Sequence, residues 1–83
     1  MVTVEIEYCV PCGLLDLAIE TQRRLLNSFG RDLDGVRLAT GHGGVFRVAV
    51  DGETVWDTDE HDGQIDNDRI AERVGDRIEA SRA

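Results

Sequence analysis

The first residues of the chain alternate between apolar and polar side chains. Between residues 2 and 8, every second position is apolar, and two carboxylates fall among the positions between them. This period of two is typical of a strand with one buried face and one face in water. Because the second face carries carboxylates, we expect helices to cover only one side of the sheet, which gives two layers.

The segment that follows is predicted to be a helix. Between residues 13 and 29 apolar side chains recur with helical spacing, and Gly30 comes next as a stop signal. A narrower apolar stripe predicts a second helix at about residues 67–81, which Asp66 or Asn67 can cap. The residues of the first helix that we expect to face the core are Leu14, Leu15, Ala18, Ile19, Leu25, Leu26 and Phe29.

Three further short strands are predicted at residues 36–40, 45–50 and 53–57. Asp51-Gly52 between the last two predicts a type I′ hairpin turn. We expect a turn at residues 31–35 and an exposed acidic loop at residues 58–63. The predicted order is β-α-β-β-β-α: one α/β domain over residues 1–83, a two-layer sandwich whose four-stranded mixed sheet carries both helices on one face.

The charge of the chain restricts its partners and its surroundings. Asp and Glu total 17 against nine basic residues, all of them arginine, for a net charge of -8. A lysine-free, acidic surface suits concentrated salt, where self-repulsion is screened, so we expect a halophilic, haloarchaeal source. The same charge argues against nucleic acid and against anionic membranes as partners.

No apolar run approaches the roughly 20 residues of a transmembrane helix, and the N-terminus lacks the layout of a signal peptide. We therefore expect a cytoplasmic protein. Persistent structural disulfides are rare in that reducing compartment, which directs attention to redox chemistry or metal binding at the two cysteines.

Cys9 and Cys12 form a Cys-x-x-Cys motif where the first strand gives way to the first helix. The free N–H groups and the dipole of a helix N-terminus stabilise a thiolate, and Pro11 suits a first helical turn because it lacks an N–H group. Two intervening residues allow the sulfurs to close into a disulfide. The motif predicts a reversible dithiol/disulfide pair that needs no cofactor.

Two other interpretations of the cysteines are open. They could be small buried apolar residues, or they could join His42 and His61 in a tetrahedral zinc site of an interaction module. The two histidines lie in different loops, which is a poor zinc-finger spacing, and each on its own is expected to be a solvated loop residue. Trp56 is expected to be a core residue without a catalytic role.

Several segments together resemble the selenoprotein W family, also called Rdx. The resemblance covers nearly the whole chain and is carried by residues 4–12, 44–48, 51–56 and 62–66. It implies a thioredoxin-like fold with the same order of elements, and an oxidoreductase activity linked to cellular thiols.

The sequence differs from the family, and from the wider thioredoxin superfamily, in two respects. Cys12 stands where selenocysteine-containing members carry selenium, so chemistry that depends on a selenol should be slower here. Pro11 is the only proline, and His42 with its neighbouring glycines takes the place where the wider thioredoxin superfamily has a cis-proline, so substrate docking cannot be carried over.

We therefore predict a thiol-disulfide oxidoreductase or redox-sensing module with Cys9 and Cys12 as its catalytic pair. Its partner would be a low-molecular-weight thiol or a protein disulfide. Thioredoxin-like geometry favours Cys9 as the attacking thiolate, whereas the selenium position of the family favours Cys12. From the sequence we assign attack to Cys9, expecting its sulfur to be exposed and that of Cys12 to be shielded in the first helical turn.

The acidic composition gives a first testable prediction. Because salt screens the repulsion among 17 carboxylates, the midpoint of thermal unfolding should rise steadily with the concentration of KCl. Melts followed by circular dichroism across a salt series measure this. A midpoint that does not depend on salt would contradict the halophilic interpretation.

Overall fold

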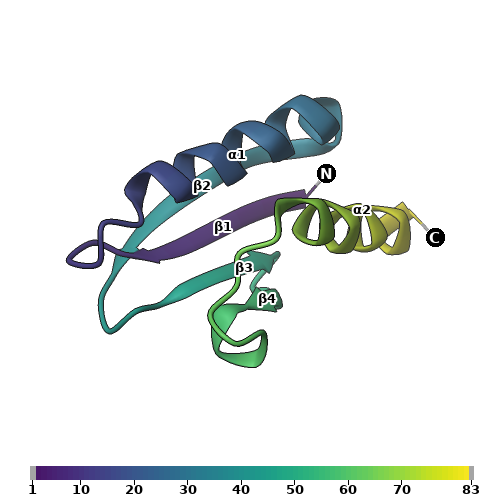
Figure 1. Cartoon of the computed structure of the whole chain (residues 1–83). Helices are drawn as coiled ribbons and strands as arrows, with labels where there is room; N and C mark the ends of the chain where they lie inside the picture. The colour runs from purple at the N-terminus through teal and green to yellow at the C-terminus, as the bar shows by residue number, and fades with distance from the viewer. Residues whose placement is uncertain (1, 83) are drawn as a thin grey trace.

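The structure is a computed structural model that describes residues 2–82. It confirms the predicted order of elements (Figure 1). None of the helices within residues 2–82 is long and apolar enough to cross a membrane. The elements are β1 (Val2–Cys9), α1 (Leu15–Phe29), β2 (Leu33–Gly41), β3 (Phe46–Val50), β4 (Glu53–Asp57) and α2 (Asn67–Arg82), with short 3₁₀ turns η1 (Gly30–Asp32) and η2 (Thr58–Glu60).

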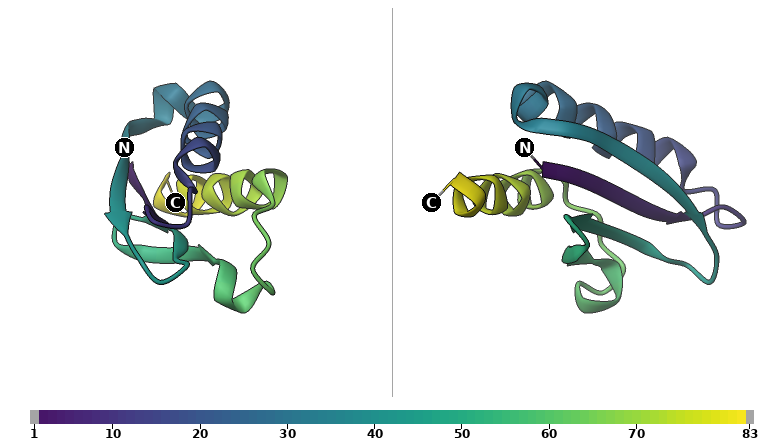
Figure 2. Two further views of the ribbon diagram at one scale, coloured as in Figure 1. Left: turned by 60° about the vertical axis from the view of Figure 1, so that its left-hand side comes forward. Right: turned by 180° about the vertical axis from the view of Figure 1, so that it is seen from behind.

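The four strands form one mixed sheet in the order β2-β1-β3-β4. β1 and β2 are parallel, as a crossover through α1 requires, and the other pairs are antiparallel. Figure 2 shows α1 and α2 together on one face of this sheet. The predicted two-layer α/β sandwich is therefore confirmed.

The turn between β3 and β4 is formed as predicted. Asp51 and Gly52 both adopt positive φ angles, 51° and 84°, which is what a type I′ turn needs. Asp51 also ties the hairpin to β1, because its N–H donates to the carbonyl of Thr3 and its carboxylate accepts from the Thr3 N–H, at 2.9 and 3.0 Å.

The core lies between the sheet and the two helices. Its largest fully buried side chains include Trp56, Phe46, Ile6, Leu25 and Ile70. Strands β1 and β3 contribute every second residue to this layer, so the period of two seen in the sequence is the pattern of burial.

The predicted apolar stripe of α1 is only partly correct. Ala18 and Leu25 are buried together with Thr21, whereas Leu15, Ile19 and Leu26 are 46%, 37% and 43% exposed. The inward positions recur at three and four residues and form one narrow line, which packs against the sheet and, at Thr21, against Asn67 of α2. The other apolar residues lie about a quarter turn around the helix.

The face of the sheet away from the helices carries charge, as expected. Glu5 pairs across the strands with Arg37, and Arg47 bridges Glu7 and Asp57 at 3.1 and 3.3 Å. Each pair joins residues that lie directly opposite in the strand register. Cross-strand pairs of opposite charge of this kind favour the observed register.

The structure corrects two local predictions and decides a third that the sequence left open. β2 begins at Leu33 rather than at residue 36, because Leu33 is buried against the sheet and a register shift beside Val2 absorbs the extra residue. The loop at residues 58–63 begins with η2, and Thr58 there is buried rather than exposed. Asp66 caps α2 by accepting a hydrogen bond from the Arg69 N–H at 3.1 Å.

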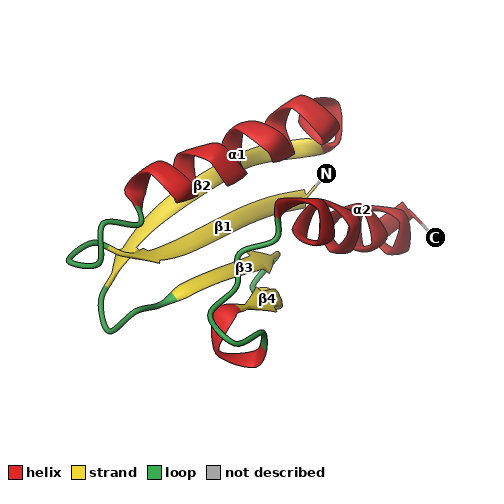
Figure 3. Cartoon of the chain, in the orientation of Figure 1, coloured by secondary structure: helices red, strands yellow, loops and turns green. Residues whose placement is uncertain are grey.

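Two loops meet at one end of the sheet. Figure 3 shows the connection from β1 to α1 and the connection from β2 to β3 at the same end of the molecule, where β1 and β2 both terminate. The parallel register places Cys9, the last residue of β1, opposite Gly41, the last residue of β2.

Adjacent leucines of α1 offer a test of this packing. Leu25 is fully buried and Leu26 is largely exposed, so Leu25→Ala should lower the free energy of unfolding by about 3 kcal/mol. Leu26→Ala, the matched control, should change it by less than about 0.5 kcal/mol. Urea unfolding of both variants measures the difference, and equal losses would contradict the orientation of α1.

Candidate redox site

The two cysteines lie on either side of a tight turn. Cys9 ends β1, and residues 10–13 form a β-turn closed by a hydrogen bond from the Gly13 N–H to the Val10 carbonyl at 3.1 Å. Pro11 occupies the second position of this turn, where its fixed φ is favourable, and Gly13 follows with a φ of 75°. The turn carries Cys12 back towards Cys9.

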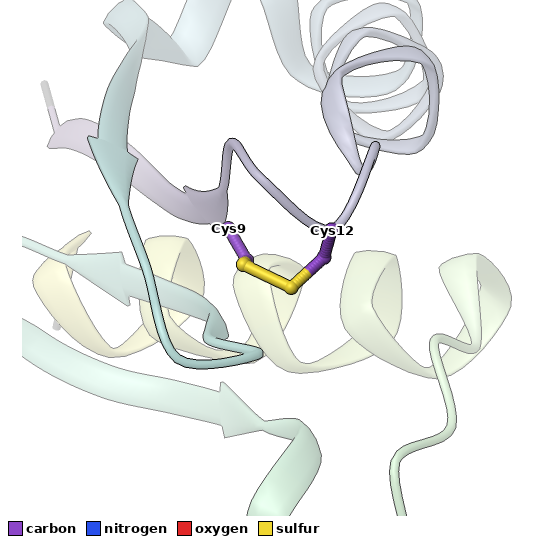
Figure 4. The surroundings of a disulfide bond; sticks show 2 residues. All are labelled: Cys9 and Cys12. Carbon is purple, nitrogen blue, oxygen red and sulfur yellow. A yellow bond between two sulfur atoms is a disulfide. The ribbon is translucent and has the colours of Figure 1, made fainter.

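The sulfurs of Cys9 and Cys12 are joined in a disulfide (Figure 4). Their Cα atoms are 5.3 Å apart, inside the range that disulfides require. The fold thus brings together the two cysteines of the motif that the sequence identified.

Two backbone hydrogen bonds attach this turn to the loop between β2 and β3. The Cys9 N–H donates to the carbonyl of Val45 at 2.7 Å, and the Val10 N–H donates to the carbonyl of Gly41 at 3.0 Å. The cysteine turn is therefore held by both ends of the neighbouring loop. The loop that contains His42, Gly43 and Gly44 therefore lies beside the cysteine motif.

Gly41 is required where the two loops meet. A Cβ atom at this position would lie 2.7 Å from Cγ1 of Val45 and 3.0 Å from Oε2 of Glu7. Val45 cannot easily move aside, because β-branched side chains are restricted at χ1. The absence of a side chain at Gly41 thus allows the loop to lie against the cysteine turn.

The exposure of the two cysteines is opposite to the prediction. Cys9 is 0% exposed, whereas Cys12 is exposed. The expectation of an accessible Cys9 and a shielded Cys12 is therefore wrong. Main-chain hydrogen bonds to Val45 and Gly41 hold the end of β1 between β2 and the start of β3, whereas residues 10–13 lie beyond the paired strands and are all exposed.

The relation of the motif to α1 also differs from the prediction. α1 begins at Leu15 rather than at residue 13, so Cys12 precedes the first helical turn and Pro11 is not its first residue. The first hydrogen bond of the helix runs from the Ala18 N–H to the Leu14 carbonyl at 2.9 Å, and Leu14 provides no side-chain cap. The N–H groups of the first turn therefore have no partner within the helix.

The histidines do not join the cysteines. His42 is exposed in the loop between β2 and β3, and His61 stacks on Trp56 with ring centroids 3.8 Å apart. Within residues 2–82 no group of three or more His, Cys, Asp or Glu side chains is placed to hold a metal ion. The zinc interpretation thus gains no support from the fold.

Trp56 and His61 belong to a separate cluster at the end of β4. Trp56 is 2% exposed, which confirms the prediction of a core residue, and its indole N–H donates to the carbonyl of Gln64 at 3.2 Å. The guanidinium carbon of Arg73 lies 5.0 Å from the centre of the Trp56 ring. His61 is thus a partly exposed loop residue that packs on Trp56, so the prediction of a solvated loop histidine is only partly correct.

A Cys-x-x-Cys disulfide at the junction of the first strand and first helix of a thioredoxin-like sheet defines a redox module. The chain matches the model of the Rdx family over residues 3–76. It belongs to this family, as the resemblance implied.

Two solved structures are similar over almost the whole chain. A protein from Bordetella parapertussis is 36% identical, with a TM-score of 0.87, and the match covers 92% of this chain and 96% of that one. A selenoprotein W-related protein from Vibrio cholerae is 26% identical, with a TM-score of 0.88 and coverages of 93% and 96%. No curated protein matches the chain significantly.

The contact at Gly41 gives a prediction for the site. Gly41→Ala should lower the free energy of unfolding by about 1–3 kcal/mol, because the new methyl group overpacks the junction of the two loops. Gly35→Ala, also in β2, is the matched control: nothing lies within 4 Å of its Cβ position, and we expect a change within about 0.5 kcal/mol. Denaturant unfolding measures both variants, and equal effects would contradict the close approach.

Proposed function

We propose that this protein is a thiol-disulfide oxidoreductase in which Cys12 is the attacking thiolate and Cys9 is the resolving thiol. One observation carries the proposal: the two sulfurs are within bonding distance, but only Cys12 is accessible to a partner. This reverses the assignment made from the sequence.

The reaction would proceed in two exchanges. The Cys12 thiolate attacks one sulfur of the partner disulfide, a Cys12–partner disulfide forms, and the other partner sulfur leaves as a thiolate. Cys9 then loses its proton and attacks the Cys12 sulfur, which forms the Cys9–Cys12 bond and releases the second partner thiolate. The partner gains two electrons and the protein loses two. A cellular dithiol or two monothiols would return the protein to its reduced form.

The site supplies two features that support these roles. The uncapped first turn of α1 begins three residues after Cys12 and offers free N–H groups for a thiolate. Burial of Cys9 prevents it from being consumed by external disulfides, so its sulfur remains for the second exchange. Both features favour a sequence of attack and resolution rather than two equivalent cysteines.

A redox-sensing module would use the same bond without turnover, and the two functions differ in kinetics. An oxidoreductase should reduce many equivalents of a model disulfide when a reductant is supplied, whereas a sensor would react once and stay oxidised until a slow reset. Consumption of hydroxyethyl disulfide per protein molecule separates these outcomes.

Single-cysteine variants test the roles directly. Reduced Cys9→Ser protein, mixed with hydroxyethyl disulfide, should accumulate a stable mixed disulfide on Cys12, because the resolving thiol is absent. Cys12→Ser should trap little, because Cys9 is buried, and the wild-type protein should pass to the internal disulfide. Intact mass after thiol alkylation identifies each species. Trapping by Cys12→Ser but not by Cys9→Ser would refute the assignment.

A further inference from the structure

Exposed apolar side chains are concentrated in one segment of the chain, which includes the accessible cysteine. Val10 is 50% exposed, Leu15 46%, Leu17 39% and Ile19 37%. Among the large apolar side chains that the structure describes as exposed, the only other one is Leu26. Four of the five therefore fall within residues 10–19, and Val10 and Leu15 are the two that come nearest to Cys12 in the sequence.

Two of these residues, Val10 and Leu15, lie within three positions of Cys12 in the sequence, and together with the exposed Pro11 we call them the apolar collar. Val10 and Pro11 lie in the turn that holds Cys12, both of them exposed, and Leu15 is the first residue of α1. Single exposed apolar residues need no explanation, but a group around a reactive sulfur marks an interaction surface.

The charge around the collar excludes one class of partner. Residues 8–22 and 38–46 contain no arginine, although they make up the turn, the first half of α1 and the neighbouring loop. The flanking Arg37 and Arg47 are paired with Glu5 and Glu7 on the open face of the sheet. The charged side chains that remain near the collar in sequence are carboxylates, Asp16 and Glu20, both exposed. An anionic thiol would meet repulsion from these carboxylates and would find no arginine in the turn, the first half of α1 or the neighbouring loop.

The neighbouring loop leaves room for a polypeptide. Gly43 and Gly44 have positive φ angles, and a Cβ atom on either would meet nothing within 4 Å. Since both ends of this loop are hydrogen-bonded to the cysteine turn, its bare backbone lies beside the collar. Exposed apolar side chains next to open backbone suit an extended chain segment better than a small molecule, which would need an enclosing pocket.

We propose that the apolar collar docks a disulfide-bearing segment of a partner protein, with apolar and non-acidic residues flanking its cysteine, and disfavours anionic low-molecular-weight disulfides. The inference rests on the proposed function, since the exchange at Cys12 is the same. It adds the class of substrate: a polypeptide rather than a small anionic thiol.

Three probe peptides of equal length test this substrate class. Each carries a central cysteine joined to the same chromogenic thiol, and the cysteine is flanked by leucine, by glutamate or by arginine. The rate at which reduced protein releases the chromophore is the readout. At low salt the leucine probe should react at least about tenfold faster than the glutamate probe, with the arginine probe between them. In 1 M KCl, where screening is strong, the leucine preference should persist.

Variants separate docking from general reactivity. Leu15→Ser should slow the leucine probe about three- to tenfold and leave a neutral small disulfide unaffected. Leu26→Ser is the matched control: it is equally exposed on α1 but lies about 16 Å further along the helix axis, and it should change neither rate. Both substitutions are at exposed positions, so both variants should fold.

The outcomes distinguish the two proposals. If no probe releases the chromophore, the oxidoreductase proposal itself is refuted. If all three probes react at equal rates, if the glutamate probe is fastest, or if Leu15→Ser and Leu26→Ser behave alike, exchange occurs but the collar is not the docking surface.

Discussion

The geometry of the redox site depends on two backbone hydrogen bonds, from Cys9 to Val45 and from Val10 to Gly41. They continue the sheet beyond its last paired residues and bring the loop between β2 and β3 over the end of β1. Cys9 thus lies within the hydrogen-bonded end of the sheet and is buried, whereas Cys12 lies in the turn beyond it and is exposed. Gly41 permits the close approach of Val45 because it has no side chain.

Several arginines form ion pairs away from the redox site, and none lies in the cysteine turn or in the neighbouring loop. On the open face of the sheet Arg37 and Arg47 neutralise carboxylates of β1 and β4, and Arg24 joins α1 to Asp68 of α2 at 2.7 Å. Exposed pairs of this kind contribute little stability individually. Their placement has a larger effect, since it leaves the cysteine turn and the first half of α1 without a cation, in a protein whose net charge is already -8.

Short sequence patterns correctly predicted the elements that depend only on neighbouring residues. The alternation of apolar and polar residues predicted β1 and β3, and Asp51-Gly52 predicted the hairpin because a type I′ turn depends on the φ angles of these two residues. The exposures of Cys9 and Cys12 could not be predicted in this way, because they depend on where β1 ends and α1 begins relative to residues distant in sequence, such as Gly41 and Val45. Likewise, helical spacing marked Leu15 and Ile19 as apolar but could not show which side of α1 the sheet and α2 would cover. The stacking of His61 on Trp56 had no signal in the sequence.

Trp56 has a consequence for how the molecule can be observed. It is the only tryptophan, and contacts with His61, Arg73 and Gln64 hold its indole where β4, η2 and α2 come together. Intrinsic fluorescence therefore comes almost entirely from this one corner and reports how α2 is seated on the sheet. Circular dichroism averages over the whole backbone instead. Any unfolding in which α2 detaches first would separate the two optical signals in a chain this small.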